Sequence, residues 1–189
     1  HLHIVGSCLS RGTDGAFRNT AVWFDDNGRL LADYSKTHLF QLMDEHQFLT
    51  GGDRLTVVET PWGRVGLSIC YDLRFPELFR RYALEGARII LLPAEWPARR
   101  QEHWNILLRA RAIENQMFVA AVNATGEIGA ESFAGGSVVI SPWGEVLASA
   151  GAEETLLHAE IDPAEVQAAR ERIPIFQDRR PEIYDLDSE

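Results

Sequence analysis

The strongest constraint on the fold is a short apolar run, residues 65–69, that ends at Cys70. The run is partly β-branched and is bounded by Gly63 and Pro76, which favours a buried strand over a helix. In residues 77–86 the apolar side chains recur at helical spacing, and Gly86 marks the expected end of that helix. Cys70 is therefore predicted at a corner between a strand and a helix, where free backbone N–H groups and an exposed side chain face the same space.

The alternation of strand and helix continues beyond this corner. An apolar strand is expected at 88–92, a helix at 102–115 and a buried strand at 117–122, which predicts neighbouring strands with helices on one face of the sheet. Elsewhere, Asn27-Gly28 predicts a hairpin and Asp162-Pro163 a helix start, with that helix running to about residue 172. The other expected strands are 2–7, 19–24, 29–34, 55–59, 137–140, 145–150 and 154–161.

The length of 189 residues predicts a single domain, residues 1–189. Its tail, 173–189, holds two prolines and the pair Arg179-Arg180, and we expect an extended C-terminal arm there. Residues 41–53 are polar and are expected to form a loop with room for one helical turn. Loops of that length within a compact domain tend to carry function.

The charge and cysteine content exclude several classes of protein. A formal net charge of −10 without a cluster of Lys and Arg argues against a nucleic-acid partner. No apolar stretch approaches the length of a membrane span, and the first residues lack both a secretory signal and an initiator Met. Cys8 and Cys70 are the two cysteines, too few for a disulfide framework. We expect a cytoplasmic protein with no membrane or nucleic-acid partner.

A lone cysteine is more often buried and inert than catalytic, so Cys70 needs partners to count as a nucleophile. The six histidines form neither a HExxH motif nor a Cys-His cluster with ligand spacing, so no metal site is expected. No glycine pair is followed by the Lys-Ser/Thr of a phosphate-binding loop, and no cofactor is expected. A Cys–His hydrolase, with His38 or His103 as the base for Cys70, stays open as an alternative.

Lys36 and Glu45 are the other candidates for chemistry. A lysine at the end of a strand is usually a solvated charge. Lys36, however, lies in the mixed apolar stretch YSKTHLF, where a partly desolvated cation can stabilise negative charge as it develops. Glu45, in the loop sequence DEHQF, would usually be a surface charge as well. If the Glu45 carboxylate is held near both a lysine and a thiol, it would position the lysine and relay the proton of the thiol.

A series of motifs covering nearly the whole chain resembles the nitrilase superfamily of carbon–nitrogen hydrolases. The motifs are YSKTHLF, GLSICYDLRFPEL, LLPAEWP, HW…LLRARAIENQMFVAAVN, FAGGSVVISPWGEVL and DRRPEIY, in that order. The resemblance implies an α/β fold, a four-layer α-β-β-α sandwich. It also implies hydrolysis by a Glu–Lys–Cys triad without a cofactor or metal, and a homo-oligomer, because family members commonly pair through helices and exchange C-terminal arms.

Carried over by position, the resemblance assigns roles to individual residues. Cys70 would be the nucleophile that forms a thioester acyl-enzyme, and Lys36 the cation that stabilises the oxyanion. The backbone N–H of Tyr71 would be the second oxyanion donor. Glu45 would match an additional loop glutamate that orients the lysine and the substrate.

The same motifs narrow the substrate class. Tyr71 and Asp72 follow the cysteine, as in the amidase branches, whereas nitrilases proper usually have Trp-Glu there. SKTHLFQLMDEH and PAEWP look most like ω-amidases, which act on the terminal amide of short 2-oxo dicarboxylate monoamides and related carboxylate-bearing amides and release ammonia. Such a substrate needs a cation for its carboxylate, and Trp96 is expected to wall the pocket. The candidate cations, each of which also fits a structural ion pair, are Arg74, Arg99 and Arg100.

One departure from the family pattern is expected to limit activity. Family members place a general-base glutamate in an opening strand–helix–strand segment, which we expect to be absent ahead of His1. Glu77 is no substitute, because it lies in the RFPEL turn, where the family has a structural residue. Two hypotheses follow. The chain is part of an amidase whose activity needs the base, or it is a non-catalytic module that keeps the fold and a ligand pocket.

Overall fold

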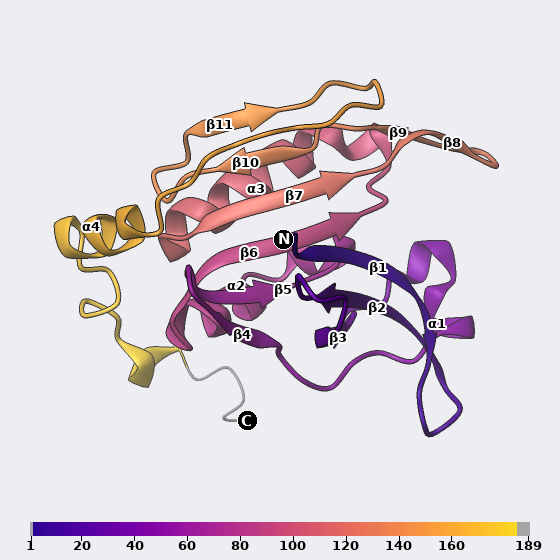
Figure 1. The fold of residues 1–189 in the computed structure, drawn as a ribbon, viewed down its shortest axis with the longest axis horizontal. Helices are drawn as coiled ribbons and strands as arrows, with labels where there is room; N and C mark the ends of the chain where they lie inside the picture. Colours follow the sequence, from indigo (N-terminus) through magenta and orange to yellow (C-terminus); the bar gives the residue numbers. More distant parts are fainter. Residues whose placement is uncertain (1, 185–189) are drawn as a thin grey trace.

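The structure is a computed structural model that describes residues 2–184, and its elements form two packed sheets and a separate hairpin (Figure 1). The strands are β1 (Ile4–Arg11), β2 (Phe17–Phe24), β3 (Leu30–Ser35), β4 (Val57–Thr60), β5 (Gly63–Leu67), β6 (Ala87–Ala94), β7 (Phe118–Asn123), β8 (Thr125–Ile128), β9 (Glu131–Ala134), β10 (Val138–Ile140) and β11 (Val146–Ser149). The α-helices are α1 (Glu45–Phe48), α2 (Pro76–Leu84), α3 (Gln101–Asn115) and α4 (Ala164–Arg172), and the 3-10 helices are η1 (Gln41–Met43), η2 (Cys70–Arg74), η3 (Ala98–Arg100) and η4 (Pro181–Ile183).

The larger sheet has six strands in the order β11-β10-β7-β6-β5-β4. Its centre is parallel, because α2 carries the chain from β5 to β6 and α3 carries it from β6 to β7. The two helices pack on the same face, where Phe79, Tyr82, Trp104 and Leu108 are fully buried against Ile90. The carboxyl ends of β5 and β6 therefore open at one edge, which is where Cys70 and the PAEWP motif follow.

The other face of this sheet packs against the three-stranded antiparallel sheet β1-β2-β3. Trp23 and Tyr34 from the small sheet are buried against Leu67, Ile89 and Phe118 from the large one. Helices, large sheet and small sheet thus form three successive layers of the expected α-β-β-α sandwich within residues 2–184 (Figure 1). The two sheets bury their apolar faces on each other, which fixes β3 beside the end of β5.

Two details of the expected strand pattern are wrong. Residues 154–161 form no strand, since they pair with none of the described strands, and Leu156 is exposed. The hairpin β8–β9 was not expected at all, since its few apolar residues are interrupted by Gly126 and Gly129, both at positive φ. The helix expected after Asp162 is present as α4, but it begins one residue later than predicted, with Pro163 as the N-cap, and the Asp162 carboxylate accepts a hydrogen bond from the N–H of Ala164.

The C-terminal arm begins with residues that return to the body of the molecule. Phe176 packs against the core beside α2, with the guanidinium carbons of Arg80 and Arg170 5.3 and 5.0 Å from its ring centre. Residues 185–189 lie outside the described residues, so the extent of the arm stays a prediction. In the described part, 2–184, no helix is both long and apolar enough to cross a membrane.

Candidate active site

Cys70 lies on a sharp turn at the carboxyl edge of the large sheet. β5 ends at Leu67, and Cys70 opens the 3-10 helix η2 with a φ of 46°. A non-glycine residue in this left-handed region is strained, a condition that clusters at functional sites. The Sγ atom faces the backbone oxygen of Glu95, 3.7 Å away, at the end of β6. The corner predicted from the sequence is therefore present, and the thiol reaches across it.

Asp72, two residues after the cysteine, holds this turn in place. Its carboxylate is fully buried and accepts hydrogen bonds from the N–H of Ile69 at 2.9 Å and the hydroxyl of Tyr34 at 2.8 Å. It also contacts His38, through the backbone N–H at 3.1 Å and the ring Nδ1 at 2.8 Å. The buried carboxylate ties the cysteine turn to β3 and the segment after it, which carries Lys36.

Lys36 and Glu45 form a tight ion pair beside the turn. The Nζ atom of Lys36 lies 2.6 Å from both carboxylate oxygens of Glu45, and the lysine side chain is only 1 % exposed. Glu45 also accepts a hydrogen bond from the N–H of Phe40 at 2.8 Å. Lys36 is the single lysine of the chain, since seventeen of its eighteen basic residues are Arg. A buried ammonium held by one carboxylate keeps its position when charge develops next to it.

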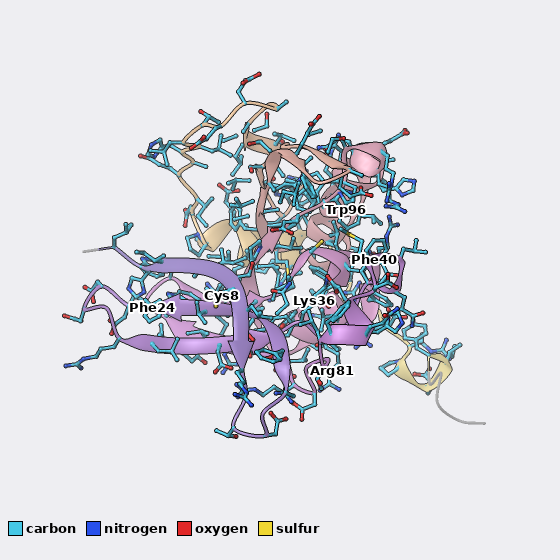
Figure 2. The ribbon with its side chains drawn as sticks, turned by 90° about the vertical axis from the view of Figure 1, so that its right-hand side faces the viewer. Cys8, Phe24, Lys36, Phe40, Arg81 and Trp96 are labelled. Carbon is cyan, nitrogen blue, oxygen red and sulfur yellow. The ribbon has the colours of Figure 1, made fainter. Side chains whose placement is uncertain are left out.

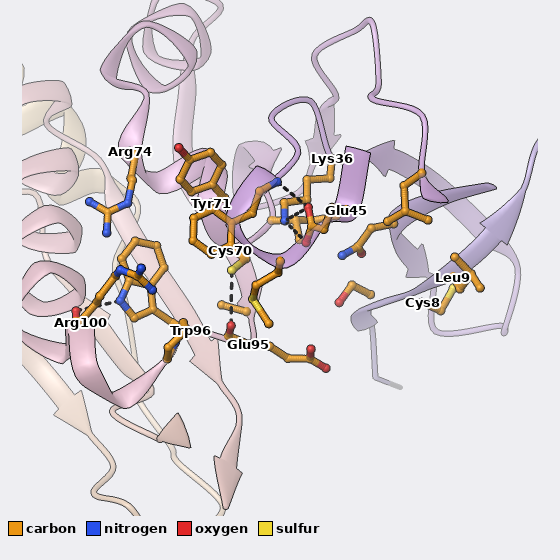
Figure 3. A pocket seen from close by; sticks show the side chains of 18 residues that line it. Cys8, Leu9, Lys36, Glu45, Cys70, Tyr71, Arg74, Glu95, Trp96 and Arg100 are labelled. Carbon is orange, nitrogen blue, oxygen red and sulfur yellow. Dashed lines mark hydrogen bonds and ion pairs between the residues drawn. The ribbon is translucent and has the colours of Figure 1, made fainter. Parts of the chain in front are cut away.

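These residues share one cavity of about 230 Å³ (Figure 3). Figure 3 shows Lys36 and Glu45 on one side of Cys70 and Arg74, Trp96 and Arg100 on the other, with Cys8 and Leu9 farther out on the Lys36 side. Figure 2 shows Lys36 near the small sheet and Trp96 toward the helices, so the cavity spans the boundary between the layers. The lining residues are Ser7, Cys8, Leu9, Asn19, Lys36, Phe40, Met43, Glu45, Leu49, Ile69, Cys70, Tyr71, Arg74, Ala94, Glu95, Trp96, Pro97 and Arg100.

The three arginines considered for substrate binding differ in whether they line the cavity. The guanidinium carbon of Arg74 lies 4.8 Å from the Trp96 ring centre, and both residues line the cavity. Arg100 also lines it. Arg99 does not, because its Nη1 pairs with Glu131 at 2.8 Å on the surface. Arg99 therefore forms a structural ion pair, which was the alternative to substrate binding in the sequence analysis.

Neither histidine of the Cys–His alternative lines the cavity. His38 is held by Asp72 and stacks on Phe75, with ring centres 3.6 Å apart. His103 meets Arg74 instead, with its Nδ1 3.2 Å from Nη2. The geometry favours Lys36 and Glu45 over either histidine as neighbours of the thiol.

The cavity also contains residues that the sequence did not single out for the site. Ser7, Cys8 and Leu9 come from β1 and Asn19 from β2, and no motif marks them. Phe40 lies within YSKTHLF, so that motif was the available signal for it. Strand residues from the opposing sheet reach a site only through the packing of the layers, which a local pattern does not encode.

Burial raises the pKa of the Cys70 thiol to about 11, an effect that the nearby Lys36 charge only partly offsets. The carboxylates of Glu45 and Asp72 raise it further. The thiol is therefore protonated at neutral pH and needs a base to become a nucleophile. Because the folded pKa lies above the ordinary value of 9.0, the protonated thiol contributes stability below pH 9 that is lost as the pH rises toward 11.

Alkylation of Cys70 in the folded protein is expected to be slow at neutral pH. Its rate should rise about tenfold per pH unit through pH 9 and level off only near pH 11, because the thiolate is the reacting species. Iodoacetamide labelling with peptide mass spectrometry measures this rate at Cys70 separately from Cys8. The unfolded chain in denaturant is the control and should level off near pH 9. A folded-state rate already on its plateau at pH 8 would contradict the raised pKa.

No three His, Cys, Asp or Glu side chains among residues 2–184 are grouped so as to hold a metal ion. The expectation of a metal-free, cofactor-free reaction stays a prediction.

Comparison with known proteins now identifies the family. The carbon-nitrogen hydrolase family model matches residues 1–171. The chain belongs to the carbon–nitrogen hydrolase family. It is 45% identical over 183 residues to the 2-oxoglutaramate amidase of Bacillus subtilis, a match that covers 97% of this chain and 71% of the relative. It is 37% identical to the omega-amidase NIT2 of Homo sapiens, with 97% of this chain and 70% of the relative covered.

The solved structures agree with this assignment. A carbon–nitrogen hydrolase from Helicobacter pylori superposes with a TM-score of 0.93 at 31% identity, covering 100% of this chain and 71% of that one. Nit3 of Saccharomyces cerevisiae, described as a member of branch 10 of the nitrilase superfamily, superposes with a TM-score of 0.85 at 31% identity, covering 93% and 65%. The predicted family and α/β sandwich are confirmed, and the chain is by family a carbon–nitrogen hydrolase of the nitrilase superfamily.

Proposed function

We propose that this carbon–nitrogen hydrolase cleaves the terminal amide of a small carboxylate-bearing amide through Cys70 and releases ammonia. The observation that carries the proposal is the order of groups along one cavity: Lys36 with Glu45, then Cys70, then Arg74 on Trp96 (Figure 3). An amide carbon at the thiol would leave its oxygen near the ammonium and its distant carboxylate near the guanidinium. The relatives named as a 2-oxoglutaramate amidase and omega-amidases support this substrate class.

The reaction has two halves. In the first, a base removes the thiol proton and Sγ attacks the amide carbon, giving a tetrahedral oxyanion. Lys36 Nζ stabilises that oxyanion together with the N–H of Tyr71, which lies in the first turn of η2, where backbone donors lack partners within the helix. The C–N bond then breaks, the nitrogen takes a proton and leaves as ammonia, and a thioester remains on Cys70. In the second half, water attacks the thioester and releases the acid and the free thiol.

The cavity limits the size of the substrate. Its volume of about 230 Å³ lies below the range of roughly 300–1,000 Å³ that is usual for drug-sized ligands. The aromatic rings of Phe40, Tyr71 and Trp96 narrow it, with the first two ring centres 4.7 Å apart. A short aliphatic acid amide fits within this volume.

A direct assay tests the proposal. Ammonia release from succinamate should exceed that from butanamide, in which a methyl group replaces the carboxylate, by about 10- to 100-fold in kcat/KM, the worth of a charge-assisted hydrogen bond. Arg74→Gln should remove most of that preference, because Arg74 would hold the carboxylate. The control is Arg81→Gln, an exposed residue of α2 that pairs with Glu85 and does not line the cavity. Failure of both amides to release ammonia would refute the proposal.

A second candidate is a ligand-binding module without turnover. The raised thiol pKa favours it, because Cys70 needs a base and Glu45 is already engaged by Lys36 and the N–H of Phe40. Binding of a short dicarboxylate without ammonia release from any monoamide would support this reading. The cytoplasmic location, the homo-oligomer and the lack of a nucleic-acid partner stay predictions.

A further inference from the structure

Three arginines line a second cavity, at the end of the sheet opposite the candidate active site. This cavity measures about 750 Å³, and its cationic wall consists of Arg64 on β5, Arg88 on β6 and Arg170 on α4. Arg88 is the second residue of β6, whereas Cys70 faces the residue that follows the strand, so roughly 20 Å separates the two cavities. Figure 1 shows α4 on the side of the molecule where β6 begins. The proposed hydrolysis makes no use of this cluster.

Two of the three guanidinium groups have no carboxylate partner among the described residues. Arg64 pairs with Glu59 at 2.5 Å. Arg88 makes no hydrogen bond or ion pair with the described part of the chain, and Arg170 donates to the backbone oxygen of Ala87 at 2.9 Å. Burial, and to a smaller degree the charge of Arg88, lowers the pKa of Arg170, so the two cations repel each other. An anion held between them would relieve that repulsion.

Two glycines at the starts of β5 and β6 make room for this arrangement. The Arg88 side chain passes over Gly63, where a Cβ atom would lie 2.8 Å from its Cδ. The Arg64 side chain passes over Gly86, where a Cβ would lie 3.3 Å from its Cδ. Both glycines have a positive φ, 106° and 85°, which other residues rarely adopt. The positions of the two arginines are therefore set by the backbone of the sheet.

The wall of this cavity also contains two carboxylates, and both are engaged by the protein. Glu59 holds Arg64, and Asp162 accepts a hydrogen bond from the N–H of Ala164 at 2.9 Å at the start of α4. Three arginines against two carboxylates give the wall a formal charge of +1, in a chain whose net charge is −10. A local excess of positive charge on an acidic protein attracts anions to that one place.

We propose that this cavity binds the phosphate group of a small molecule between Arg88 and Arg170. A guanidinium presents its N–H donors in a planar fork that matches phosphate oxygens, and a phosphate dianion neutralises both unpaired cations. The volume of about 750 Å³ lies within the usual range for small-molecule sites. Trp62 lines the same cavity and is 47% exposed, so it offers an aromatic surface to the organic part of a phosphate ester.

Calorimetry and thermal unfolding with inorganic phosphate and AMP test the inference. Inorganic phosphate should bind with a Kd of about 1 mM, the strength of two charge-assisted hydrogen bonds. About 20 mM phosphate should then raise the melting temperature by about 4 °C relative to sodium chloride of equal ionic strength. Tighter binding of AMP, lost in Trp62→Leu, would identify the ligand as a phosphate ester rather than free phosphate. Absence of binding by both anions would overturn the inference.

The variant Arg88→Gln separates a ligand site from a purely structural cluster. Because Arg88 has no partner among the described residues and repels Arg170, its loss should leave the melting temperature of the ligand-free protein unchanged or higher. Phosphate binding should weaken about tenfold or more, and Arg88→Lys should restore part of it. The control Arg54→Gln removes a positive charge that pairs with Asp33 outside the cavity, and it should keep the wild-type Kd. Unchanged phosphate binding in Arg88→Gln, or a lower melting temperature without ligand, would overturn the inference.

Discussion

Replacing Cys70 with alanine is expected to lower kcat for ammonia release by at least about 10⁴-fold, the scale on which removal of a nucleophile acts. The reason is geometric. Cys70 lies on the strained turn between β5 and η2, beside Lys36 and the first-turn N–H groups, and no other thiol has that setting. Ammonia release from a short ω-monoamide measures the loss, and circular dichroism checks the fold.

Cys8, the other cysteine of the chain, is a suitable control. It lies on β1 and lines the same cavity. Cys8→Ala should retain activity within about threefold, because Cys8 lies within the strand β1 and not at the start of a helix, where free backbone N–H groups lower a thiol pKa. Rapid quenching with peptide mass spectrometry should find the acyl group on Cys70. An acyl adduct on Cys8, or full activity in Cys70→Ala, would refute the assignment.

The elements around Cys70 could be predicted because their signals are local. The apolar run at 65–69, bounded by Gly63 and followed by Pro76, predicts a strand and then a helix from residues that are close together in the sequence. Residues 154–161 show the limit of that reasoning. They alternate well enough to predict a strand, yet a strand exists only where a neighbour pairs with it, and no described strand does. The hairpin β8–β9 is the opposite case: its two strands pair with each other, although no apolar pattern in the sequence predicts them.

The residues of the candidate site also fall into two groups, those that a local motif identifies and those that only the packing of the sheets brings there. Cys70, Lys36 and Glu45 were found through motifs, each of which is continuous in sequence. The buried carboxylate of Asp72 was not, although it joins the cysteine turn to Tyr34 and to the His38 segment. That connection spans thirty-four residues to His38 and depends on how the two sheets pack, which no local pattern reports. The contact with Asp72 also explains why His38, a candidate base for Cys70 in the sequence, is not one in the structure: its ring is held by Asp72 and does not face the thiol.

Replacing Lys36 with methionine is the second large effect we expect. The variant should lower kcat by about 10²- to 10³-fold, because one of the two donors to the oxyanion is lost. It should also lower the free energy of unfolding by about 3 kcal/mol, because the mostly buried carboxylate of Glu45 loses its cation and keeps only the N–H of Phe40. Denaturant unfolding and steady-state ammonia release measure the two effects separately.

The double variant Lys36→Met with Glu45→Gln decides between a catalytic lysine and one that only supports the loop. Neutralising Glu45 removes the unpaired buried charge, so much of the lost stability should return. The rate should not return, since methionine offers no donor to an oxyanion. Because Lys36 is the single lysine, a sample labelled with [¹⁵N]lysine also reports this one ammonium, which should shift when a thioester forms on Cys70. Recovery of the rate together with stability would mean that the ion pair shapes the cavity while some other group stabilises the oxyanion.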